Sequence, residues 1–234
     1  MKAAFVSDIH GNEIALLNCL GAIERLQIDQ IHFLGDAVGY LPGEIPVLDR
    51  IKTEGFECQQ GNHEAMLIAE RQPDPERDAT YRIAPAQARL SATTHLARIR
   101  AWPTHVIRLI AGRRFLLVHG SPSDELFGYV HEDTDLEPFS RVEADVVVMA
   151  NTHRPWIREL NDKVFVNAGS VGLPRDHGML AAFAVYDSDS ERCRIVRVPL
   201  DLPEIARRYG HDIAPSVAQC FARRVERPFG EIVS

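Results

Sequence analysis

Short apolar runs and longer amphipathic segments alternate along the first quarter of the chain. Runs at 3–6, 31–34 and 55–60 have the length of strands, and each is followed by a turn rich in glycine and polar residues. Segments 12–26 and 44–52 carry apolar residues at close to helical spacing, which predicts helices. This alternation favours an α/β domain with parallel strands, in which binding sites form beyond the carboxyl ends of the strands.

After residue 100 the pattern changes from strand–helix units to hairpins. Hairpins are predicted over 105–110 with 114–118 and over 181–186 with 193–198, and single strands over 144–150 and 163–167. The remaining predicted elements are helices over 65–70, 86–100 and 202–224, a loop around Pro73 and Pro75, and a loop over 124–135. The change of pattern predicts two sheets packed together in one domain.

Polar side chains that can bind metals follow the predicted strands. They are Asp8 and His10, Asp36, Asn62 and His63, His119, and His153. Any one of these motifs occurs often by chance, but the repeated position of such residues at strand ends favours a shared site. An alternative with Ser121 as a nucleophile is disfavoured because no Gly-x-Ser-x-Gly turn surrounds that residue.

The length and composition of the chain exclude several classes of protein. The chain has 234 residues, 45% of them apolar, which is enough to build a large core. No apolar run approaches the roughly 18–20 residues of a membrane helix, and no signal peptide is apparent. The four cysteines form no CxxC pair, which predicts reduced thiols in a cytoplasmic protein. The net charge of −7 disfavours nucleic acid as a stable partner.

The motifs together resemble those of the calcineurin-like metallophosphoesterase superfamily. The matching residues are Asp8-Ile9-His10, Gly35-Asp36 with Gly39, Gly61-Asn62-His63-Glu64, His119-Gly120 and Thr152-His153. The neighbouring stretches 35–40 and 167–176 are similar to those of YfcE-like bacterial and archaeal phosphoesterases. The likeness covers residues 1–200 as one domain, with 201–234 expected as a helical appendage of the same domain. It implies a four-layer α/β/β/α sandwich of two mixed sheets.

The resemblance also implies a site with two divalent metal ions, which clamp a phosphoryl group and activate water. Asp36 would bridge the metals, and Asp8, His10 and His153 would complete the first metal's ligands. Asn62 and His119 would serve the second metal and Asn62 the substrate as well, while Arg175 could bind the substrate phosphate. His63 would protonate the leaving oxygen or stabilise its charge. This mixture of ligands suits manganese, iron, zinc or nickel.

One residue departs from the family pattern. The family has Gly-His-Thr-His where this chain has Ala150-Asn151-Thr152-His153. Asn151 offers an amide oxygen, a weaker ligand for a transition metal than imidazole. We therefore expect an intact first metal site and a weakened second site. His131 or His177 could reach in to replace the lost ligand.

Several functional alternatives stay open at this point. The substrate of a phosphoesterase of this type could be a phosphodiester, a phosphomonoester, a phosphoprotein or a dinucleoside polyphosphate. Phe127 and Tyr129 in the 124–135 loop could stack on a nucleobase or cover the core. The rival function is a scaffold or binding module on the same fold, as in the retromer subunit, and the oligomeric state is undetermined.

Overall fold

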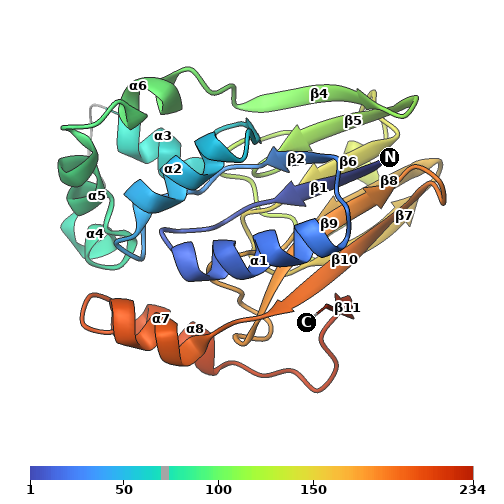
Figure 1. The fold of residues 1–234 in the computed structure, drawn as a ribbon. Helices are drawn as coiled ribbons and strands as arrows, with labels where there is room; N and C mark the ends of the chain where they lie inside the picture. Colours follow the sequence, from blue (N-terminus) through green and yellow to red (C-terminus); the bar gives the residue numbers. More distant parts are fainter. Residues whose placement is uncertain (70–73, 234) are drawn as a thin grey trace.

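Two mixed sheets lie face to face, and most of the helices cover one of them (Figure 1). The structure is a computed structural model that describes residues 1–69 and 74–233. The six-stranded sheet has the order β11-β10-β9-β1-β2-β3, with β1 Lys2–Val6, β2 Gln30–Phe33, β3 Glu57–Cys58, β9 Leu180–Asp187, β10 Arg192–Pro199 and β11 Glu231–Ile232. The five-stranded sheet has the order β4-β5-β6-β8-β7, with β4 His105–Ile110, β5 Arg113–Val118, β6 Val146–Met149, β7 Trp156–Leu160 and β8 Lys163–Asn167.

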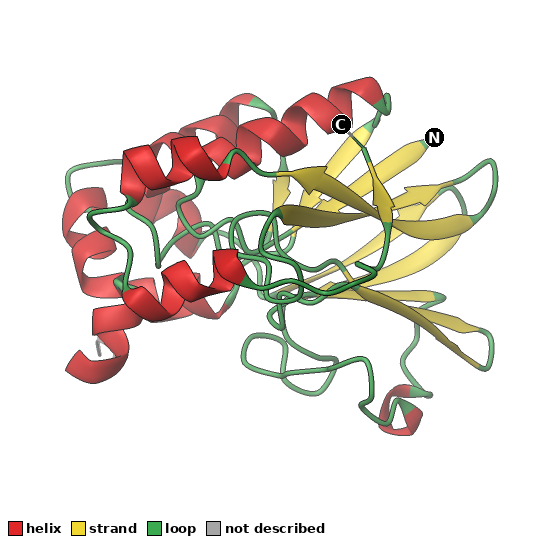
Figure 2. Ribbon diagram, turned by 90° about the horizontal axis from the view of Figure 1, so that it is seen from below, coloured by secondary structure: helices red, strands yellow, loops and turns green. Residues whose placement is uncertain are grey.

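The strands that lead to the polar motifs are parallel neighbours. β1 pairs with β2 and β2 with β3 in parallel, and in the second sheet β5 pairs with β6 and β6 with β8 in parallel. β9 runs antiparallel to β1, which makes the first sheet mixed. The carboxyl ends of β1, β2, β5 and β6 therefore open toward the loops at the end of the molecule where the helices gather (Figure 2).

The helices are α1 Glu13–Arg25, α2 Glu44–Thr53, α3 Asn62–Ile68, α4 Pro75–Tyr81, α5 Ile83–Leu90, α6 His95–Arg100, α7 Leu202–Tyr209 and α8 Pro215–Ala222, with a short 3-10 helix η1 at Glu137–Phe139.

Successive side chains of β1 point to opposite faces of the sheet, and each face contributes to a different part of the core. Ala4 and Val6 pack toward the helices, and Ala3 and Phe5 pack between the sheets.

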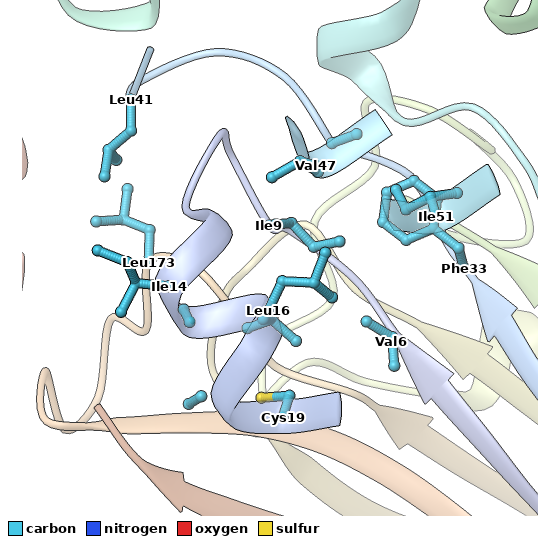
Figure 3. Close-up of a cluster of buried hydrophobic side chains, with 14 of the residues drawn as sticks. Val6, Ile9, Ile14, Leu16, Cys19, Phe33, Leu41, Val47, Ile51 and Leu173 are labelled. Atoms are coloured by element: carbon cyan, nitrogen blue, oxygen red, sulfur yellow. The ribbon is translucent and has the colours of Figure 1, made fainter. Parts of the chain in front are cut away.

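The core beneath α1 and α2 fixes the first metal-binding motif in place (Figure 3). Ile9 is fully buried in this cluster beside Leu16 and Val47, and Leu173 joins it from the loop that follows β8. Because Ile9 lies between Asp8 and His10, its burial anchors the turn that carries both polar side chains.

The fold class predicted from the sequence, α/β with two mixed sheets, is confirmed. The outer face of the five-stranded sheet is covered by Val130, Leu136 and Phe139, which belong to the segment around η1. This outer layer is therefore a loop with a 3-10 turn, whereas the resemblance to the family implied a helical layer there.

The sequence-based boundaries fail in several places. The predicted helix over 86–100 is two helices, α5 and α6, because the hydroxyls of Ser91 and Thr93 donate to the carbonyls of Ala88 and Leu90 and compete with the helix. Pro75, taken as part of a loop, begins α4, where a proline is tolerated at the first position. Strand β3 is shorter than predicted, and β7 and β11 were missed. Glu70 and Pro73 lie outside the described residues.

Candidate metal centre

The polar residues predicted from the strand ends converge between the two sheets. Asp8 and His10 follow β1, Asp36 follows β2, Asn62 and His63 begin α3, His119 follows β5 and His153 follows β6. All of these side chains are buried, with Asn62 the most exposed at 6%. The predicted convergence is therefore observed across nearly 150 positions of sequence.

The distances are those of a compact cluster. His153 Nε2 lies 3.2 Å from Asp8 Oδ1, and His10 Nε2 lies 3.6 Å from the same oxygen. On the other side, Asp36 Oδ2 lies 3.7 Å from His10 Nε2 and 3.5 Å from His119 Nε2. Three groups of these side chains could each hold a metal ion: Asp8 with His10 and His153, Asp8 with Asp36 and His119, and His10 with Asp36 and His63.

Hydrogen bonds at the far side of each ring orient the three histidines. The Nδ1 atoms face backbone carbonyls, which only accept: His10 with Val38 at 3.0 Å, His119 with Leu34 at 3.0 Å and His153 with Leu173 at 2.6 Å. Nδ1 of each ring therefore carries a hydrogen, and Nε2 is the nitrogen that is turned toward the cluster. Outer hydrogen bonds of this kind are typical of metal-binding histidines.

The cluster fits a cation because its acceptor atoms face one another. His10 Nε2 and His153 Nε2 are 3.1 Å apart, and both carry lone pairs there. Asp8 is fully buried, and neither of its carboxylate oxygens accepts a hydrogen bond from the described part of the chain. A buried carboxylate without hydrogen bonds is costly unless positive charge lies beside it.

The close packing of these charged groups also shifts the pKa values of Asp8 and His119. Burial alone would raise the pKa of Asp8, but the imidazole of His153 and contacts with His10 hold it well below its usual range. Burial alone would lower the pKa of His119, but the Asp36 carboxylate raises it to about 9. Positive charge, from a proton or a metal ion, is therefore favoured between these carboxylates and imidazoles.

Backbone strain is concentrated in the same turns. Five of the residues in them that are not glycine have left-handed φ angles between +50° and +63°: Asp8, His10, Asp36, Asn151 and His153. Such conformations cost of order 1–3 kcal/mol each and collect at functional sites, where the surrounding packing enforces them. The strain supports a functional origin for the arrangement.

Glu64 is a site residue to which the sequence analysis gave no role. Its buried carboxylate accepts hydrogen bonds from the backbone N–H groups of Asp36 at 2.6 Å, Ala37 at 2.7 Å and Gly61 at 2.9 Å. It thereby ties the loop after β2 to the start of α3. Burial and the nearby Asp36 raise the pKa of Glu64 to about 7. The available signal was its capping-box position, three residues after Gly61.

His63 is enclosed by aromatic rings on the wall of the cluster. Its ring centroid lies 4.9 Å from that of Tyr40 and 5.0 Å from that of Tyr81, and its backbone N–H donates to Asp36 Oδ1. Burial lowers its pKa to about 3, so the imidazole is neutral. Tyr81 comes from α4, a helix that the sequence did not predict, and was therefore missed.

Asn151 does not point its amide nitrogen at the cluster. That nitrogen donates to the carbonyl of Gly128 at 2.9 Å, in the 124–135 loop.

His131 and His177 lie apart from the candidate ligands. His131 stacks on Tyr129 with ring centroids 6.2 Å apart, and neither His131 nor His177 belongs to any group of described residues that could hold a metal. The expected replacement of the lost ligand by one of these histidines is therefore wrong.

Arg175 lies beside the cluster. Its backbone N–H donates to the carbonyl of His153 at 3.1 Å, and its guanidinium donates to the Tyr40 hydroxyl at 3.0 Å. It lines a cavity of about 430 Å³, here called the arginine pocket, together with Tyr40, Tyr129, Arg154 and Arg223. Phe127, which the sequence paired with Tyr129, is half exposed and does not line this pocket.

The fold and the cluster at the strand ends define a metallophosphoesterase, an enzyme that hydrolyses phosphate esters. Residues 1–191 match the calcineurin-like phosphoesterase superfamily domain, and the chain belongs to that superfamily. The resemblance noted from the motifs is confirmed.

Relatives with similar sequence or structure come from archaea and bacteria. The chain is 24% identical over 215 residues to protein MJ0912 of Methanocaldococcus jannaschii, covering 85% of this chain and 88% of that protein. It is similar in structure to protein PH1004 of Pyrococcus horikoshii, with a TM-score of 0.83, 21% identity and coverage of 94% and 97% of the two chains. A metallophosphoesterase from Sphaerobacter thermophilus matches with a TM-score of 0.77, 22% identity and coverage of 95% and 98%.

Within the described residues, no helix combines the length and apolar character needed to cross a membrane.

The lack of space between Gly39 and His63 gives the first prediction. A Cβ added at Gly39 would lie 2.2 Å from His63 Nδ1, at a backbone φ of +87°. We expect Gly39→Ala to shift the imidazole and to lower hydrolysis of p-nitrophenyl phosphate about 100-fold, since a displacement of about 1 Å can cost that much.

Gly112→Ala is the matched control for this variant. Gly112 has a similar φ of +85°, and its added Cβ would meet nothing within 4 Å. Gly112→Ala should lose about 1–2 kcal/mol of stability in urea unfolding from its backbone angle alone, and Gly39→Ala should lose more because its Cβ also meets His63 and the carbonyl of Tyr81, but only Gly39→Ala should lose activity. Equal activities of the two variants would show that Gly39 does not position His63.

Proposed function

We propose that this enzyme hydrolyses a small phosphate ester with two divalent metal ions bound in the cluster. Asp36 would be shared by both metals, Asp8, His10 and His153 would hold the first, and Asn62 and His119 would hold the second. The approach of His10 Nε2 to within 3.1 Å of His153 Nε2, with Nδ1 of each ring facing a backbone carbonyl, is the observation that carries this proposal. When bound, such metal ions clamp the phosphoryl group and supply a nucleophile from water near neutral pH.

The donor set supports transition metals over magnesium or calcium. Imidazole nitrogens, carboxylate oxygens and one amide oxygen favour manganese, iron, zinc or nickel. Asn62 Oδ1 lies 2.9 Å from His119 Nε2, so the two second-metal ligands are already adjacent. Asn151 leaves that second site without the imidazole that the family pattern supplies.

His63 and Arg175 act on the substrate in this proposal. His63 Nε2 lies 3.9 Å from Asp36 Oδ2, so its ring edge faces the cluster in which the phosphate would bind. Its neutral imidazole donates a hydrogen bond to the leaving oxygen and stabilises the charge that develops there. Arg175 holds the phosphate through its guanidinium, and Asn62 contributes its amide.

The substrate is a small phosphate ester in preference to a phosphoprotein. The arginine pocket of about 430 Å³ has the size of a small-ligand site.

Comparing bis(p-nitrophenyl) phosphate with p-nitrophenyl phosphate, each with manganese, iron, zinc and nickel, separates diesterase from monoesterase activity. A lack of hydrolysis with all four metals would favour the alternative function, a scaffold on the same fold.

The buried cluster argues against that scaffold. A protein that only binds partners through its surface has no need for Asp8 without hydrogen bonds or for strained turns at Asp36 and His153. These features cost stability and are explained by a reaction inside the cluster.

We further propose that residues 201–234 belong to the same domain as residues 1–200. Ile205 and Tyr209 of α7, with Val217 and Cys220 of α8, are buried in the core cluster that contains β1 and α1. A separate appendage would carry its own core.

The metal sites give a second prediction. After dialysis against a chelator, calorimetric titration with Mn²⁺ should show one tight equivalent and a second that is at least about tenfold weaker. Asn151→His should tighten the second equivalent, since it restores an imidazole, while Asp8→Asn should weaken the first. Two equally tight equivalents in the unmodified protein would contradict the weakened second site.

His63 gives a third prediction. His63→Ala should lower kcat about 10²–10⁴-fold for an alkyl phosphate, whose leaving group is a strong base, and less for p-nitrophenyl phosphate. The metal content should stay unchanged. His95→Ala, a buried histidine on α6 that pairs with Asp49, is the control. An equal loss for both esters would show that His63 does not act on the leaving group.

A further inference from the structure

The arginine pocket has a charge opposite to that of the molecule. The chain has a net charge of −7, yet Arg154, Arg175 and Arg223 all line this one cavity, and no carboxylate of the described residues does. Clefts lined by one sign of charge concentrate ligands of the other sign.

None of these three guanidiniums is in an ion pair within the described part of the chain. Other arginines are paired: Arg197 with Asp176, Arg208 with Glu13 and Arg89 with Glu44. The side chain of Arg175 donates only to the Tyr40 hydroxyl, and that of Arg223 only to the carbonyl of Arg175 at 3.3 Å, again among the described residues. Like charges gathered without carboxylates repel one another, so an anion is the ligand that this pocket suits.

The three arginines reach the pocket from different parts of the chain. Arg175 donates its backbone N–H to the carbonyl of His153, and Arg154 is the next residue after His153. Arg223 comes from the end of α8, on the opposite wall, and reaches the carbonyl of Arg175. One phosphate held in the cluster by Arg175 therefore leaves Arg154 and Arg223 available for a second anionic group.

The C-terminal segment is fixed where it would be needed for this role. The N–H of Gly178 donates to the carbonyl of Arg223 at 3.0 Å. The fully buried guanidinium of Arg197 binds both oxygens of Asp176 and also the carbonyl of Phe229. These contacts join the loop that carries Arg175 to the tail that carries Arg223, so the pocket wall is preorganised.

Two tyrosines complete the pocket. Tyr129 is about half exposed and stacks on His131, and Tyr40 lies against His10 and His63. The exposed ring of Tyr129 is available for stacking on the organic part of a substrate.

We propose that the substrate carries a second phosphate group apart from the scissile one, and that Arg223 and Arg154 bind this second phosphate. The inference rests on the proposed function, because it assigns the scissile phosphate to the cluster. It gives the segment after residue 200 a role in substrate specificity.

The test uses substrates that differ only in the second phosphate. Phosphate release would be measured with Mn²⁺ from adenosine 3′,5′-bisphosphate, adenosine 3′-monophosphate and adenosine 5′-monophosphate. We expect kcat/KM for the bisphosphate to exceed both monophosphates about 10- to 100-fold, the range of one or two charge-assisted hydrogen bonds. Arg223→Gln and Arg154→Gln should each reduce that preference about tenfold.

Arg224→Gln is the matched control, because Arg224 is exposed next to Arg223 and does not line the pocket. It should keep the preference. Calorimetric binding of the same three nucleotides to the Mn²⁺-loaded protein separates the two proposals. Hydrolysis without preference for the bisphosphate, or a preference that survives Arg223→Gln and Arg154→Gln, would overturn the inference and leave the proposed function standing. Tighter binding of the bisphosphate that depends on Arg223, without turnover of these nucleotides or of the p-nitrophenyl esters, would overturn the proposed function and support the second-phosphate site.

Discussion

Repulsion between buried acceptors is the constraint on which this structure depends. Two carboxylates, Asp8 and Asp36, lie between the sheets with the Nε2 atoms of His10, His119 and His153 turned toward them. In water each group would be solvated, but here the neighbours are mainly other acceptors. A bound cation would remove the repulsion between these acceptors, and its attraction to the carboxylates is large in a site without water. The cluster is therefore both the costliest part of the fold and the part that explains its function.

The rest of the fold holds these groups against that repulsion. Parallel strands bring their carboxyl ends to one edge, and left-handed turns aim the side chains inward. Backbone carbonyls fix the imidazoles, and Glu64 joins two loops through three backbone N–H groups. Ile9 anchors the first turn in the core under α1. The reaction needs fixed geometry, and each of these contacts supplies part of it without touching the substrate.

The sequence predicted what depends on local pattern and motif. Alternating strands and helices gave the α/β class, and the residues after each strand gave the cluster, because parallel strands place their ends together. It could not predict Tyr81, since α4 begins at a proline that also signals a loop. It could not predict the arginine pocket, because Arg175 and Arg223 come together only when the end of α8 reaches the loop after β8. The hydrogen bond from Asn151 to Gly128, and the failure of His131 to reach the cluster, likewise depend on how a long loop folds back.

The central claim is that the cluster holds two metal ions with Asp36 between them. Anomalous X-ray diffraction from crystals grown with Mn²⁺ tests it most directly. The account predicts two anomalous peaks about 3.5–4 Å apart, one beside Asp8, His10 and His153 and a weaker one beside Asn62 and His119, with Asp36 shared. Manganese bound elsewhere on the molecule, with no peak among these side chains, would contradict it.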